Sequence, residues 1–149
     1  MTAGAEIAGL TRYHKKGEPG APLSEMKLLE GLGVEGDFHQ GVERQVSFLS
    51  AEVRRWMEAQ TEKTEKGLCF GRFRENILIE GLPLEDLGNG CLLTVGDAVL
   101  RISMHNKLCY DECSLFSQGK PCRLSGSAAF AVVERGGTVR IGDLVSMTK

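Results

Sequence analysis

The sequence predicts a mainly-β, barrel-like single domain, residues 1–149, with one or a few short helices. Three observations support this fold class. Short apolar segments are bounded by glycines, which mark tight turns and bulges between strands. Two glycine-containing dipeptides separate pairs of such segments, as hairpin turns do. Only one stretch shows the helical spacing of apolar residues, and we find neither an internal repeat nor a low-complexity linker that would divide the chain.

The first part of the chain contains two expected strands and the start of a helix. Residues 6–12 predict a first strand. Residues 13–22 hold two prolines and two glycines, so we expect a loop there. Residues 26–30 fit either a short helix or a strand. Residues 45–49 predict a strand that leads into a helix with Ser50 as its N-cap.

The helix after Ser50 is predicted from the spacing of its apolar residues. Its core-facing side is formed by Val53, Trp56 and Met57. We expect the opposite side, with Arg54, Arg55 and Glu58, to face water.

The second part of the chain is rich in predicted strands. The expected strands are residues 76–80, 91–95, 98–103, 128–134, 138–141 and 144–147. Gly96-Asp97 predicts a hairpin between the second and third of these strands, and Gly136-Gly137 predicts one between the fourth and fifth.

Composition narrows the class of function. A formal net charge of −2 and a pI near 5.9 predict no general attraction to nucleic acid or to an anionic membrane. No apolar run approaches the roughly 20 residues that a membrane span needs. The N-terminal residues lack the features of a secretory signal, and five cysteines do not form a complete set of disulfide pairs. We therefore expect a protein of the reducing cytoplasm.

Three of the five cysteines follow the strand predicted at residues 98–103, as Cys109-x3-Cys113-x8-Cys122. In one interpretation, a single thiol is a nucleophile, a sulfur carrier or one metal ligand. Lys107 would then lower the pKa of Cys109 and raise its thiolate fraction.

In a second interpretation, His105, Cys109, Cys113 and Cys122 together bind zinc, since four nitrogen and sulfur ligands suit a tetrahedral site. The tight Cys-x2-Cys spacing of most structural zinc sites is absent. In a third, the thiols only pack. The segment by itself leaves all three open.

Two further segments carry candidate binding residues. Between Gly33 and Gly41, Asp37 and His39 stand two apart and could face an anionic or polar ligand, or form an ordinary turn. Arg74 and Asn76 precede a strand and point to the same side of an extended chain. They could bind phosphate or carboxylate, or be a solvated strand entrance.

These segments together resemble a MOSC domain, the family named for the C-terminal region of molybdenum-cofactor sulfurases. The resemblance runs from about Glu6 to Val145. The matching segments are Gly36-Asp37-Phe38-His39-Gln40-Gly41, Arg44-Gln45-Val46-Ser47, Glu52, Gly71 to Ile77, Gly81-Leu82-Pro83-Leu84, Gly90, Gly96-Asp97, the cysteine segment, Phe130-Ala131, and Gly136-Gly137 to Gly142-Asp143. The stand-alone bacterial branch is most similar, because its cysteine segment has the same spacing.

The resemblance implies a barrel-like fold and association with the molybdenum cofactor, or with sulfur carried for it. Cys109 corresponds to the family cysteine proposed to hold a persulfide or to ligate molybdenum, with Lys107 beside it. Arg74 and Asn76 correspond to the Arg-x-Asn that contacts the cofactor in amidoxime-reducing relatives. We also expect cofactor binding by the residues of the glycine-rich and following motifs, namely Asp37, His39 and Arg44.

The resemblance also implies partners. These are a molybdopterin-type small molecule and a cysteine desulfurase or molybdoenzyme. We expect no PLP to be bound by this chain, because the sulfurases carry PLP on a separate desulfurase domain. A molybdenum-dependent reductase of N-hydroxylated compounds is a further alternative. The branch usually has histidine directly after the first cysteine, whereas this chain has Tyr110.

Overall fold

The computed structural model describes residues 5–15, 20–37, 45–59, 75–82, 88, 90–105 and 128–148, which form eleven strands and one helix. The strands are β1 (Glu6–Arg12), β2 (Ala21–Leu23), β3 (Glu25–Leu29), β4 (Gly33–Val34), β5 (Val46–Ser50), β6 (Ile77–Glu80), β7 (Leu92–Val95), β8 (Ala98–His105), β9 (Ala128–Arg135), β10 (Gly137–Arg140) and β11 (Val145–Thr148). The helix is α1 (Ala51–Ala59).

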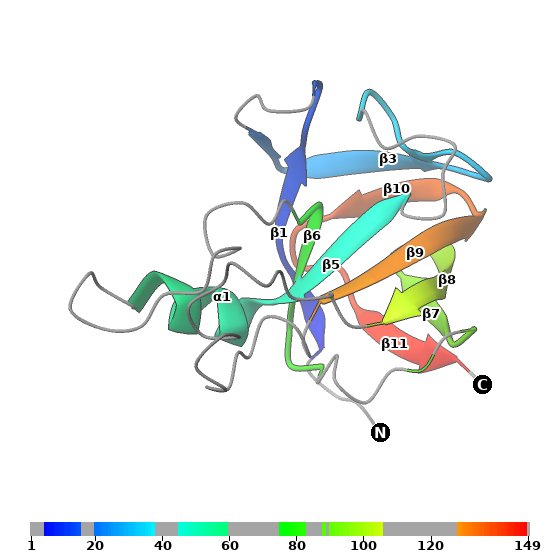
Figure 1. Cartoon of the computed structure of the whole chain (residues 1–149). Coiled ribbons are helices and arrows are strands. Elements are labelled where there is room, and N and C mark those ends of the chain that lie inside the picture. The colour runs from blue at the N-terminus through cyan, green and yellow to red at the C-terminus, as the bar shows by residue number, and fades with distance from the viewer. Residues whose placement is uncertain are drawn as a thin grey trace, which may run out of the picture.

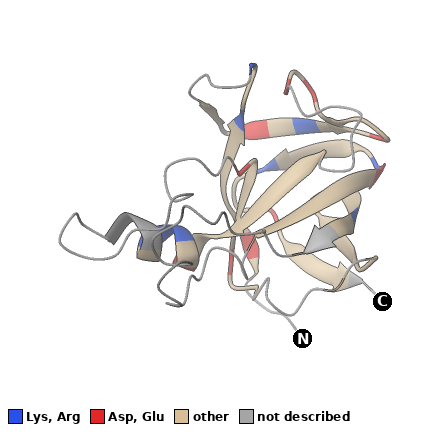
Figure 2. Cartoon of the chain, viewed as in Figure 1, with Lys and Arg blue, Asp and Glu red and all other residues tan. Residues whose placement is uncertain are grey.

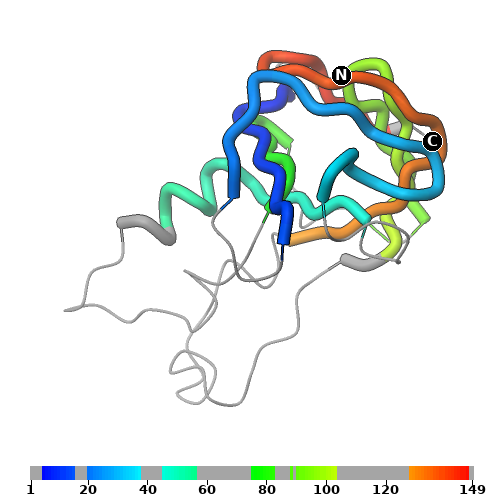
Figure 3. The backbone as a smooth tube through the Cα atoms, turned by 90° about the horizontal axis from the view of Figure 1, so that it is seen from above, coloured from blue at the N-terminus to red at the C-terminus, as the bar shows by residue number. Residues whose placement is uncertain are grey.

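Eight strands form one sheet in the order β11-β7-β8-β9-β5-β6-β1-β2, and β10, β3 and β4 form a second sheet (Figure 1). Neighbouring strands are antiparallel except β5 and β6, which are parallel. Seen from above, the strands wrap around a common interior, with α1 to one side (Figure 3). Over the described residues the large sheet stays open, with β11 and β2 as its edges. Its ends approach where Glu6 bridges to Leu144, so the fold is barrel-like without being a closed barrel.

The core is formed by the inward side chains of both sheets. Phe48, Ile77, Ile79, Leu100 and Ile102 are among its fully buried members. All five residues of β5 are buried, which shows that both faces of this strand are covered. Neither β5 nor most of β9 carries a charged side chain, as Figure 2 shows. The middle of the sheet is thus buried and largely free of charged side chains.

Most of the predicted elements are confirmed. The strand predicted at residues 6–12 is β1, and Gly96-Asp97 forms the turn of the β7–β8 hairpin, in which Val95 pairs with Ala98. Helix α1 begins directly after Ser50, and the side chain of Val53 is fully buried. The ambiguous segment 26–30 is a strand, β3, with an alternating burial pattern typical of a half-buried strand.

Two predictions about connections are wrong. Gly136-Gly137 does not make a hairpin, because β10 pairs with β3 of the second sheet. One residue separates β9 from β10, too few for a hairpin loop. A Cβ on Gly136 would lie 2.6 Å from the carbonyl oxygen of Leu28, so glycine here permits the close crossing between sheets.

The loop predicted over residues 13–22 is also shorter than expected. Ala21 and Pro22 belong to β2, which pairs antiparallel with the end of β1. Strand β2 is an edge strand, where the missing N–H of a proline costs no ladder hydrogen bond.

Candidate functional site

Asn76 is the centre of a buried polar network at the entrance of β6. Its side chain is 1% exposed, and its Nδ2 donates to the carbonyl oxygen of Thr11 at 3.1 Å and to Oδ2 of Asp37 at 2.9 Å. Its Oδ1 accepts hydrogen bonds from the backbone N–H of Ser47 at 3.0 Å and from the Ser47 hydroxyl at 3.1 Å. An amide side chain has two donors and two acceptor positions. All four are used inside the protein.

Asp37 joins the glycine-rich motif to this network. Its carboxylate is buried, at 5% exposure, and Oδ2 accepts from the backbone N–H of Tyr13 at 2.9 Å as well as from Asn76. Two residues selected from separate motifs, 39 positions apart, are therefore in direct contact. The contact ties the turn after β4 to the start of β6.

Arg54 and Glu75 extend the network. The Arg54 guanidinium forms a bidentate ion pair with the Glu75 carboxylate. Its Nε donates to Oε2 at 2.9 Å, and its Nη2 donates to Oε1. The side chains are only 17% and 10% exposed. The prediction that Arg54 faces water is therefore wrong, whereas Arg55 is exposed as expected and pairs with Glu80.

The same Glu75 is held from its backbone. The Tyr13 hydroxyl donates to the carbonyl oxygen of Glu75 at 3.0 Å. Glu75 stands between Arg74 and Asn76 in the sequence, and it is held by Tyr13, which directly follows β1, and by Arg54 of α1.

Sequence reasoning missed Tyr13, Ser47, Arg54 and Glu75 as members of this network. A partial signal existed for Ser47, which closes the Arg44–Ser47 match, and for Glu75, which lies inside the Arg-x-Asn motif. No local pattern marks Tyr13, because its partners are 24 and 62 positions away.

The other predicted site residues lie outside the described residues. They are His39, Arg44, Arg74, Lys107, Cys109, Cys113 and Cys122. His105, the fourth proposed zinc ligand, is the last residue of β8. Over the part of the chain that the structure describes, no group of three or more His, Cys, Asp or Glu could hold a metal ion.

Met104, next to the last residue of β8, lies on the same row of the sheet as Asn76. The backbone N–H of Asn76 donates to Ser47 O, Ser47 pairs with Phe130, and Phe130 pairs with Met104 of β8. These residues form one row across the sheet, about 14 Å from Asn76 to Met104 at the usual strand spacing. Cys109 follows Met104 by five residues, and five extended residues span at most about 17 Å.

Cys91 provides a described thiol for comparison. It lies partly buried beside the core, and this burial raises the pKa of its thiol above the ordinary value. A raised pKa lowers the fraction of thiolate, the reactive form, at any pH below it.

The family of the chain follows from its sequence profile. The model of the MOSC domain matches residues 35–146, which include the Asp37–Asn76 contact and the cysteine segment. The chain belongs to the MOSC domain family. MOSC domains are associated with molybdenum-cofactor function. No curated protein matches the chain.

Solved structures agree with this MOSC fold. The YuaD protein from Bacillus subtilis has a TM-score of 0.68 and 21% identity, over 96% of this chain and 95% of that one. YiiM from Geobacillus stearothermophilus has a TM-score of 0.65 and 16% identity, over 97% of this chain and 75% of that one. YiiM from Escherichia coli has a TM-score of 0.59 and 20% identity, over 97% and 70%. At these identities, the similarity shows a shared fold and nothing about function.

Among the helices that the structure describes, none has the length and apolar character to span a membrane.

Proposed function

We propose that this MOSC protein binds the molybdenum cofactor or carries sulfane sulfur on Cys109 for molybdoenzyme maturation in the cytoplasm. The observation that carries the proposal is the hydrogen bond of 2.9 Å between Asn76 and Asp37. This bond brings two family motifs together at one end of β6. His39 follows Asp37 by two residues, and Arg74 precedes Asn76 by two. Both are therefore proposed to bind one ligand.

The motif residues have two different roles, positioning and ligand contact. Asn76 has no hydrogen-bonding capacity left for a ligand, and Asp37 already binds a backbone N–H, so both are positioning residues. Arg74, Arg44 and His39 are the proposed contacts for the cofactor. An arginine fork suits the phosphate of a pterin cofactor.

The residue types fit a phosphate-bearing cofactor at its anionic end. Two cations and an imidazole stand in the segments that flank the buried Asp37–Asn76 pair. A bound cofactor would supply the metal and its redox chemistry. The protein residues bind and orient its phosphate.

Cys109 is the proposed sulfur carrier. Cys109 follows Met104 of β8 by five residues in the sequence, and Lys107 would favour its thiolate. The Cys109 thiolate attacks the outer sulfur of a persulfide on a desulfurase. The sulfur–sulfur bond of the donor breaks, the donor cysteine leaves as a thiolate, and Cys109 becomes a persulfide.

The test is to incubate the protein with a cysteine desulfurase and L-cysteine and to map modified cysteines by mass spectrometry. We expect Cys109 to gain the mass of one sulfur atom. Cys91 is an internal control, because its raised pKa leaves it less thiolate. In Cys109→Ser the added sulfur should disappear. Sulfur found equally on Cys91 would indicate unspecific reaction and contradict the assignment.

Elemental analysis of the freshly purified protein separates the alternatives. Molybdenum that is lost in Arg74→Ala supports cofactor binding through the arginine. Stoichiometric zinc, lost together with thermal stability on addition of a chelator, would instead support the His105/Cys109/Cys113/Cys122 site. Protein that takes up neither sulfur nor molybdopterin would overturn the proposal.

A further inference from the structure

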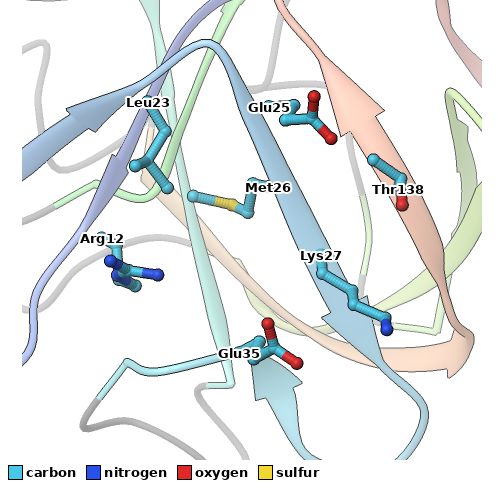
Figure 4. A pocket seen from close by; sticks show the side chains of 7 residues that line it. All are labelled: Arg12, Leu23, Glu25, Met26, Lys27, Glu35 and Thr138. Carbon is cyan, nitrogen blue, oxygen red and sulfur yellow. The ribbon is translucent and has the colours of Figure 1, made fainter.

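A groove lies where the chain passes from one sheet to the other. Strand β2 belongs to the large sheet, β3 belongs to the small one, and Ser24 is the single residue between them. The groove has a volume of about 260 Å³. Its walls include Arg12, Leu23, Glu25, Met26, Lys27 and Glu35 (Figure 4).

Two cationic and two anionic side chains line the groove without forming ion pairs with one another. Within the described residues, Arg12, Lys27, Glu25 and Glu35 make no ion pair. Elsewhere in the described structure, charged side chains of α1 and β8 do pair, for example Arg101 with Glu134. Both signs of charge are therefore available to a ligand in one small space.

The Arg12 side chain packs against the turn after β4. The side chain is partly buried, and it lies against the backbone of Gly36, which has a φ of +82°. A Cβ at Gly36 would stand 3.1 Å from Cδ and 3.4 Å from Nη1 of Arg12. Glycine at this position therefore makes room for the arginine side chain. A guanidinium with restricted freedom loses less entropy when it binds a carboxylate.

An apolar surface separates the charges. Met26 is 2% exposed and Leu23 is partly exposed, and both line the groove. In Figure 4, Met26 lies between Arg12 on one side and Thr138 on the other, and Glu35 lies below Met26, between Arg12 and Lys27. Sites for drug-sized ligands have about 300–1,000 Å³, so this groove suits a smaller molecule.

We propose that this groove binds a small zwitterion of the free α-amino acid class with an apolar side chain. Arg12 binds its carboxylate through the planar guanidinium fork. Glu35, which directly precedes Gly36, binds its ammonium group. The apolar side chain rests on the partly exposed Leu23, behind which Met26 is almost fully buried. This proposal does not rest on the sulfur and cofactor chemistry proposed above, and its test does not depend on Cys109.

Three probes with one carbon skeleton test the proposal. L-leucine carries both charges, 4-methylpentanoate lacks the ammonium group, and 3-methylbutylamine lacks the carboxylate. They are titrated into the ¹⁵N-labelled protein, with the backbone amides of Lys27 and Thr138 as reporters. We expect saturable shifts with L-leucine and affinities weaker by about tenfold or more for the other two, because each loses one charge-assisted hydrogen bond.

Two variants and a control locate the binding. Arg12→Gln and Glu35→Gln should each weaken L-leucine binding by about tenfold or more. Glu30→Gln raises the net charge by one, as Glu35→Gln does, at an exposed position outside the groove, and should bind as the unmodified protein does. Equal binding of 4-methylpentanoate and L-leucine would overturn the proposal. So would unchanged binding in Arg12→Gln, or the absence of saturable shifts with L-leucine.

Discussion

The buried network and the groove meet at Gly36 and differ in whether their polar and charged side chains have partners. On one side, the buried network gives Asp37 and Asn76 hydrogen-bond partners inside the protein. On the other side, the groove leaves Arg12 and Glu35 without an ion pair among the described residues. Only Gly36 separates Glu35 of the groove from Asp37 of the network, yet the two regions differ in their access to water.

Access to water explains the difference. A polar group removed from water costs free energy unless it is hydrogen-bonded, so the network must be complete for the fold to be stable. Charges at the groove stay partly or fully hydrated, and leaving them without partners costs little. A completed network therefore supports structure, and hydrated charges of both signs in one hollow remain available for a ligand.

The largest expected effect comes from opening the network at its centre. Asn76→Ala removes four hydrogen bonds and leaves buried partners unsatisfied, so we expect the free energy of unfolding to fall by about 3 kcal/mol. Urea denaturation followed by circular dichroism measures it. The groove variant Glu25→Gln should change stability by less than about 0.5 kcal/mol.

If Asn76→Ala does not accumulate, Ser47→Ala is the milder variant. It removes only the hydroxyl, and we expect a loss of about 1 kcal/mol. A stability change in the network variants no greater than in Glu25→Gln would end the contrast between the two regions.

The next effect concerns the two neighbouring arginines of α1. Arg54→Ala leaves the mostly buried Glu75 carboxylate without its cation, and we expect the free energy of unfolding to fall by about 2 kcal/mol. Arg55→Ala is the matched control. Its pair with Glu80 is exposed, at 60% and 38%, and should contribute nothing measurable.

Equal losses in the two arginine variants would mean that burial does not decide the value of these ion pairs. A double-mutant cycle with Glu75→Gln isolates the interaction, and we expect its coupling energy to resist added salt, since a buried pair is screened less.

The smallest expected effect is at Gly36, which joins both regions. Gly36→Ala places a Cβ at positive φ and against Arg12, so we expect about 1 kcal/mol of destabilisation together with weaker L-leucine binding. Gly31→Ala is the control. Gly31 has a φ of +72° and no heavy atom within 4 Å of the added Cβ. The Gly31→Ala variant should lose a similar amount of stability and keep its affinity for L-leucine. Loss of affinity in both variants would refute the role of Gly36 in placing Arg12.

Much of the fold could be predicted from local patterns. The short apolar segment that becomes β1, the Gly96-Asp97 turn and the spacing of apolar residues in α1 are all properties of neighbouring residues. The partner of β10 could not be predicted this way. Its pairing with β3 depends on how closely Gly136 can approach Leu28, more than a hundred positions away in the chain.

The candidate site was predictable in part. Asp37 and Asn76 could be selected from their motifs, but the sequence does not show that they are in contact or that Asn76 is completely hydrogen-bonded. The environment of Arg54 was predicted wrongly. Helical spacing places it outside the apolar side formed by Val53, Trp56 and Met57, and its partner Glu75 comes from a distant segment.

By itself, the sequence determined the fold class, most strand positions, the family and the motif residues, because periodicity, turn chemistry and ordered motifs are local. The tertiary structure decided which of the selected residues are buried and partnered. It also decided where charges stay hydrated, in the groove beside Gly36. The physical reason is that burial and hydrogen-bond completion depend on contacts between segments far apart in the chain. No local pattern records those contacts.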